Sequence, residues 1–86
     1  MEGLIEGRIV HYVMPDGEHR PAIVVKVWKT ADMTQGYVNL VVFADGANDL
    51  HYASTPDQPD QVTLWATSKY YSEGKTSGTW HWIEKA

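Results

Sequence analysis

Short runs of β-branched and aromatic residues alternate with polar residues along this chain, and no helical pattern persists. Apolar residues do not recur at i, i+3, i+4 and i+7 over about eleven positions, as they would in an amphipathic helix. The runs are separated instead by turn signals such as Pro15-Asp16-Gly17 and Asp45-Gly46. The pattern predicts five strands, at 8–14, 21–29, 37–44, 61–67 and 79–84, and a brief edge segment at 51–54.

Five short strands at this spacing predict an all-β fold, either a small five-stranded SH3-like barrel or a strongly bent antiparallel sheet. A two-layer sandwich made from two such chains is the alternative. The 86 residues suffice for a single all-β domain, 1–86, with one core. A domain this small buries a modest fraction of its surface, and without cysteine it has no disulfide to stabilise it. We therefore expect a homo-oligomer.

Alternation along the predicted strands separates an aliphatic face from a mixed face, because successive strand side chains point to opposite sides. We assign the aliphatic face to the core, and its members are Ile23, Val25, Val27, Val38, Leu40, Val42, Val62 and Leu64. The mixed face carries several rings, and burial of each is worth roughly 1.5–3 kcal/mol, so we expect it to be covered. The predicted oligomer interface consists of Lys26, Trp28, Tyr37, Asn39, Phe43 and Trp65. The alternative is that bent strands turn both faces inward at their ends.

Charge excludes two classes of partner. The net charge is −4, and the seven Lys and Arg residues are scattered along the chain. Non-specific nucleic-acid binding and membrane-surface binding both need clustered positive charge, so we expect neither. No run has the apolar length of a transmembrane helix. The lack of cysteine fits a reducing cytoplasm.

The chain carries no motif of a known catalytic class, and we expect that it is not an enzyme. There is no cysteine nucleophile and no GxSxG elbow. The segment Gly74-Lys75-Thr76 fails as a phosphate loop, because Lys69 stands where that motif needs glycine and a strand follows. Polar groups in this turn could still donate weakly to an anion. The acidic residues of 45–60 are typical of turns and solvated loop.

The four histidines show no metal-ligand spacing. They stand at positions 11, 19, 51 and 81, with no HxH or HExxH pattern. A lone histidine is more often a hydrogen-bonded structural residue. We therefore expect no metal site and no cofactor.

The predicted last strand places Trp80 and Trp82 on one face and His81 on the other. Two rings two residues apart could form a platform that stacks on a base or a sugar. The alternative is that one or both rings cap the barrel, which the sequence leaves equally open.

Segments 19–25, 38–49 and 65–68 and the closing Gly78-Thr79-Trp80-His81-Trp82 together resemble a family of small uncharacterised bacteriophage and prophage proteins. The layout matches over nearly the whole chain, but Ile83 stands where the family pattern has proline after the second tryptophan. The resemblance implies a phage protein in the cytoplasm of an infected bacterial host, and it implies no mechanism. A weaker likeness links Arg20-Pro21-Ala22-Ile23-Val24-Val25 to the opening hairpin of the MazF-like toxin ribonucleases, and we use it as a fold analogy only.

These observations suggest a binding protein that sequesters a nucleotide-like signalling molecule of host immunity without catalysis. Rings would stack on the base, and cationic side chains would meet phosphates. One alternative is a virion or assembly component that uses the aromatic face for protein–protein contact, and a second is a toxin-like SH3-fold ribonuclease. The predicted ligand-binding residues are Arg20, Thr67, Ser68, Lys69, Trp80, His81 and Trp82.

Overall fold

The computed structural model describes residues 1–29, 33–49 and 62–84, and within them the chain forms one five-stranded sheet. The strand order is β4-β3-β2-β1-β5. The strands are β1 (Ile9–Val13), β2 (His19–Val27), β3 (Val38–Phe43), β4 (Thr63–Lys69) and β5 (Trp80–His81), with 3-10 turns η1 (Met33–Gln35) and η2 (Gly46–Asp49). The predicted all-β class is confirmed. The predicted edge segment 51–54 lies outside the described residues.

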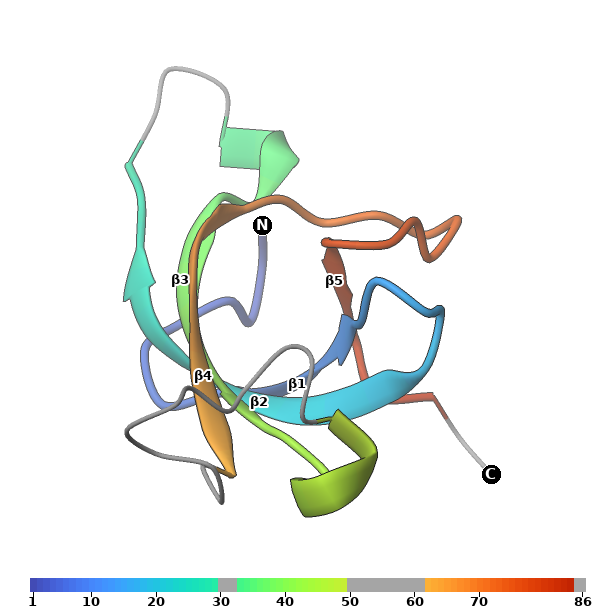
Figure 1. The fold of residues 1–86 in the computed structure, drawn as a ribbon. Helices are drawn as coiled ribbons and strands as arrows, with labels where there is room; N and C mark the ends of the chain where they lie inside the picture. The colour runs from blue at the N-terminus through green and yellow to red at the C-terminus, as the bar shows by residue number, and fades with distance from the viewer. Residues whose placement is uncertain (30–32, 50–61, 85–86) are drawn as a thin grey trace.

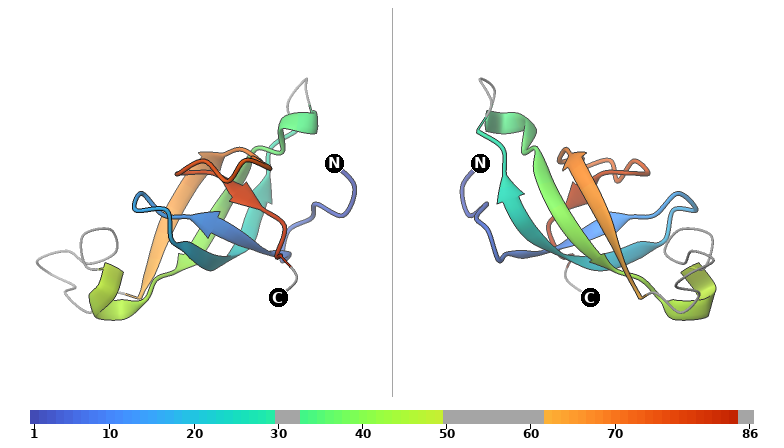
Figure 2. Two further views of the ribbon diagram at one scale, coloured as in Figure 1. Left: turned by 90° about the vertical axis from the view of Figure 1, so that its right-hand side faces the viewer. Right: turned by 60° about the vertical axis from the view of Figure 1, so that its left-hand side comes forward.

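The sheet bends so strongly that its two ends meet. Figure 1 shows the chain after β4 crossing to the far side of the barrel, where it lies beside β5. There Trp80 N donates to Tyr70 O at 3.1 Å, and Ser72 N donates to Trp80 O at 2.9 Å. All four strand pairs are antiparallel, and this short parallel contact closes the ring. Figures 1 and 2 place η1 and η2 at opposite ends of the barrel. None of the described elements is a helix long and apolar enough to cross a membrane.

The core fills the concave side of the sheet around Trp80, whose side chain is fully buried. Its indole Nε1 donates to the carbonyl oxygen of Gly36 at 2.7 Å. A Cβ at Gly36 would lie 3.0 Å from Trp80 Cζ2, and the backbone φ there is +63°, so the position suits glycine. The core consists of Val10, Tyr12, Met14, Ala22, Val24, Val38, Leu40, Val42, Ala66 and Trp80.

The core-facing side of β2 differs from the predicted one. Ala22 and Val24 are buried, whereas Val25 is 44% exposed and Ile23 is half-buried on the outer face. Val24 pairs with Leu40 and Lys26 pairs with Asn39, which leaves Val25 as the extra residue of a β-bulge. The assignment of Ile23 and Val25 to the core was therefore wrong. The bulge returns Val27 to the inner side, where it packs against the core as predicted.

The core assignment of β3 is confirmed, because Val38, Leu40 and Val42 are all fully buried. On the neighbouring strand Leu64 packs against the core, but Val62 is exposed and its assignment was wrong. Val62 precedes the first residue of β4, so it lies beyond the end of the barrel wall.

Substitution with aspartate at two aliphatic positions should separate the two faces. Leu40→Asp buries an unpaired charge and should abolish cooperative unfolding. Val25→Asp places its charge in solvent and should change the free energy of unfolding by about 1 kcal/mol or less. Thermal unfolding followed by circular dichroism measures both. Loss of folding in both variants would show that the outer position of Val25 is incorrect.

Candidate metal centre

Three histidines from three neighbouring strands converge on one carboxylate. His11 lies on β1, His19 begins β2 and His81 ends β5, and β1 lies between the other two strands. His11 is the register partner of His81, and His19 is the partner of Val13, two residues from His11. The ring centroids lie between 4.6 and 6.1 Å apart. Glu84, three residues after His81, completes the cluster.

Two of the contacts in this cluster have the length that separates neighbouring ligands in a metal coordination shell. Glu84 Oε1 lies 3.3 Å from His11 Nδ1 and 3.3 Å from His19 Nδ1, and it also contacts His81 Nε2. Ligands held about 2.0–2.1 Å from a tetrahedral zinc ion lie about 3.3–3.4 Å from one another. The four ligand atoms all lie within 4.8 Å of one another, so the most distant pair needs only a small side-chain adjustment to reach this geometry.

The pKa shifts of His81 and Glu84 favour the protonation states that metal ligation needs, which are neutral imidazole and ionised carboxylate. Burial lowers the pKa of His81, which favours its neutral form. The hydrogen bond with His11, joined by that with His81, lowers the pKa of Glu84 to about 2. Glu84 is therefore ionised at neutral pH.

The cluster is closed toward the barrel and open toward solvent. The His81 side chain is 4% exposed, those of His11 and His19 are partly exposed, and that of Glu84 is 38% exposed. An ion can therefore reach the cluster without opening the core. His81 Nδ1 is buried and has no hydrogen-bond partner among the described residues, which costs free energy. The contact at Nε2 must therefore help to hold this ring in place.

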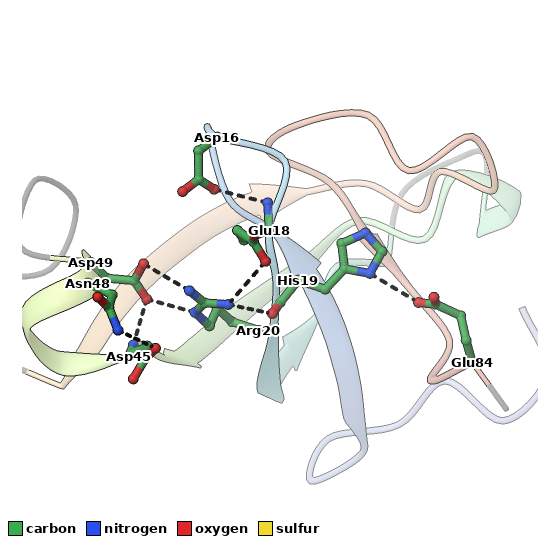
Figure 3. Close-up of polar contacts among 8 residues, drawn as sticks. All are labelled: Asp16, Glu18, His19, Arg20, Asp45, Asn48, Asp49 and Glu84. Carbon is green, nitrogen blue, oxygen red and sulfur yellow. Dashed lines mark hydrogen bonds and ion pairs between the residues drawn. The ribbon is translucent and has the colours of Figure 1, made fainter. Parts of the chain in front are cut away.

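Arg20, a predicted ligand-binding residue, is engaged inside the protein. Its Nε and Nη2 donate to the buried Asp49 carboxylate at 2.8 and 3.2 Å, and its Nη1 donates to the His19 carbonyl oxygen at 2.9 Å. Figure 3 shows Arg20 reaching Asp49 on η2 while the adjacent His19 ring turns toward Glu84. Arg20 therefore fixes the backbone of one candidate metal ligand and is not free to meet a phosphate.

The predicted stacking platform is not present, because Trp80 is fully buried. Trp80 instead fills the barrel, in line with the alternative that one or both tryptophan rings cap the barrel. Trp82 is half-buried, meets Trp80 edge-to-face with centroids 5.0 Å apart, and lies beneath the Arg8 guanidinium at 5.5 Å. His81, predicted with them, lies instead in the candidate cluster with His11, His19 and Glu84.

The other predicted ligand-binding residues lie beside part of the predicted interface. Asn39 Oδ1 accepts three hydrogen bonds of 2.9 Å, from Trp28 Nε1, Thr67 Oγ1 and Ser68 N. A bulge in β4 makes this possible, because Val38 pairs with Lys69 and Leu40 pairs with Ala66. Lys26 Nζ lies 4.0 Å from the centroid of the Trp28 ring, and the Tyr37 ring lies 6.0 Å from that of Tyr70. The three hydrogen bonds to Asn39 thus fix the packing of β2, β3 and β4, and Lys69 takes part through its backbone pairing.

The remaining predicted interface residues, Phe43 and Trp65, lie on the same outer face as Asn39 and Thr67 but form none of these hydrogen bonds. Both are exposed, and Trp65 is 56% exposed. Trp65 is the last member of an uncharged row that crosses four strands through successive register partners. We call this the outer row, and it consists of Ile9, Ile23, Val41 and Trp65.

Sequence reasoning missed this candidate cluster because its four members are far apart along the chain. We expected no metal site because the histidines have no close spacing in the sequence. Strand pairing nevertheless brings three of them together. One signal was available: His11 and His19 flank the predicted turn at Pro15-Asp16-Gly17, which brings them onto paired strands. Comparisons with protein families, curated proteins and solved structures find no match for this chain.

The Arg20–Asp49 pair should contribute stability that depends on pH. The hydrogen bond from Arg20 lowers the pKa of Asp49 below its ordinary value of 3.8. Because the folded-state pKa is the lower one, the contribution is complete above the ordinary value and is lost as the pH falls through the folded-state value. At pH 7 Asp49→Asn should lower the free energy of unfolding by about 2–3 kcal/mol.

Urea unfolding from pH 7 down to acid measures this, with the exposed Glu73→Gln as the control. The difference between wild type and Asp49→Asn should shrink as Asp49 becomes protonated in the wild type. A difference that stays constant over the whole pH range would show that the charge of Asp49 is not what stabilises the fold.

Proposed function

We propose that this protein binds a divalent transition-metal ion of the zinc class through His11, His19, His81 and Glu84. The observation that carries the proposal is the convergence of three imidazole nitrogens on one carboxylate oxygen, two of them at 3.3 Å. Imidazole ligands suit zinc, cobalt, nickel and copper, whereas magnesium and calcium prefer oxygen ligands throughout. The donor set therefore favours the former group.

The arrangement supports a role in binding rather than catalysis. With Glu84 in place, four protein ligands complete the shell, as in structural zinc sites, whereas catalytic sites keep one position for water or substrate. A bound ion would connect the segment after β5 to the β1–β2 hairpin. This connection would stabilise a small domain that has no disulfide. No pocket is found among residues 1–29, 33–49 and 62–84, and a metal ion bound at the barrel surface needs none.

Metal binding can be tested by titrating zinc or cobalt into the full chain in competition with a coloured chelator. We expect one ion per chain and a higher midpoint temperature of thermal unfolding. When free metal is at about one hundred times its dissociation constant, the free energy of unfolding should rise by about 2.7 kcal/mol. His11→Ala and His19→Ala should each weaken binding by at least about tenfold, since each removes a ligand.

The matched pair Glu84→Gln and Glu73→Gln controls for charge, because only the first removes a carboxylate of the cluster. Glu84→Gln should weaken binding and Glu73→Gln should not. The proposal fails if wild type binds no more tightly than the His11→Ala, His19→Ala double variant, since binding would then come from scattered surface groups.

The outer row supports a second candidate function, which is self-association through the outer face of the sheet. Trp65, Ile9 and the nearby Phe43 and Val25 are exposed, and none of them is charged. The net charge of −4 makes two copies repel each other, so an uncharged face is where a second copy can approach at the lowest electrostatic cost. A two-fold dimer would use the same row from both copies.

Sedimentation at micromolar concentration should give a mass above the 9.7 kDa of one chain. Trp65→Ser should weaken self-association by at least about tenfold, because exposed aromatic anchors dominate interface energies. Ile5→Ser is the control, since Ile5 is exposed but precedes the sheet. A monomeric wild type would exclude this interface, and the face would then be free for a different protein, as in a virion contact.

A further inference from the structure

The two oxygens of the Glu84 carboxylate contact different groups. Oε1 lies among the three histidines, and Oε2 lies 3.4 Å from Lys75 Nζ. Lys75 lies in the turn before β5, where its own N–H donates to Ser72 O at 3.2 Å. The same turn is fixed to β1 by a hydrogen bond of 2.8 Å from Gly78 N to Val13 O. The lysine and the histidines are therefore held by the barrel on opposite sides of one carboxylate.

Glu84 is the least anchored member of this arrangement. The three histidines belong to strands, whereas Glu84 follows β5 in a segment without regular structure. It also has the most exposed side chain of the four candidate ligands. Displacing Glu84 breaks its contacts with the histidines and with Lys75 but breaks no strand pairing, whereas the histidine backbones are fixed by the sheet. The position of the Glu84 carboxylate is therefore the one that an outside ligand can take at the lowest cost.

The positive charges around this position favour an oxyanion as the outside ligand. Three neutral imidazoles and a divalent ion leave two positive charges, and Lys75 adds a third. A small anion with two oxygens can place one oxygen where Oε1 lies and the other near Lys75 Nζ, as the Glu84 carboxylate does. Carboxylates and phosphates both have this form, and both accept charge-assisted hydrogen bonds from lysine. A neutral ligand would not gain a charge-assisted hydrogen bond from Lys75.

We infer that the metal-bound protein holds a small oxyanion, a carboxylate or a phosphate, in the place of the Glu84 carboxylate and in contact with Lys75. Glu84 then acts as an internal competitor that covers the position when no anion is present. This inference rests on the proposed metal binding and adds to it an exchangeable fourth ligand.

The test uses the full chain loaded with cobalt, because the visible absorption of cobalt changes with its ligands. The probes are inorganic phosphate and acetate at constant ionic strength. Glu84→Ala removes the competitor, so this variant should hold cobalt less tightly and bind one of the probes at least about tenfold more tightly than wild type. Lys75→Met in the Glu84→Ala background should reverse that gain. Lys29→Met, which removes an exposed lysine elsewhere, should not.

The outcomes separate the two proposals. If wild type and Glu84→Ala bind cobalt but neither probe changes the spectrum of Glu84→Ala, the inference is overturned and metal binding stands. Anion binding that does not depend on Lys75 also overturns it. If wild type binds no cobalt, the proposed function itself fails. Tighter binding of phosphate or of acetate supports the inference and assigns the anion class. Glu84→Gln repeats the test with a side chain of nearly the same size, and circular dichroism confirms the folding of each variant.

Discussion

The burial of Trp80 organises both the barrel and the candidate metal centre. Its indole fills the interior and donates to Gly36 O, while its backbone joins β1 on one side and the chain after β4 on the other. Because neighbouring strand residues point to opposite sides, the inward position of Trp80 directs His81 outward, beside His11. The same residue therefore closes the sheet and sets the direction of a candidate ligand.

This arrangement explains how a chain of 86 residues can combine a small core with a polar cluster. The core occupies the concave side, and the histidines lie where β1, β2 and β5 come together. Arg20 adds a second constraint, because it binds Asp49 through its side chain and the carbonyl of His19 at the same time. The polar groups around the cluster are thus fixed by strand pairing and by one buried ion pair.

The sequence predicted the elements better than their orientation. The strand class and the inward side of β3 could be read from alternation, since Val38, Leu40 and Val42 alternate with other residue types. In β2 the run Ile23-Val24-Val25 is aliphatic on both faces, so alternation had no contrast from which to choose a side. The bulge at Val25 then reversed the pattern, and a bulge depends on pairing with a distant strand.

The candidate site was less predictable for a related reason. Its four members come from three strands and a following segment, and only strand order makes them neighbours. Residue type also led to wrong predictions, because tryptophan and arginine are typical of ligand sites. In this protein Trp80 fills the core and Arg20 pairs with Asp49. His81 alone was placed in a site by both the sequence and the structure, with a different role in each.

The ion pair between Arg20 and Asp49 has an evolutionary consequence. Loss of Asp49 leaves an arginine largely buried without its acid, and loss of Arg20 leaves a fully buried carboxylate without its base. Each single replacement is therefore selected against, while a joint replacement by two apolar residues avoids an unpaired charge but must also make up for the hydrogen bonds to the His19 carbonyl oxygen and from Asp45 N. Descendants of this protein should keep both residues or lose both, and such paired change would mark the contact between β2 and η2 in any lineage that diverged from it.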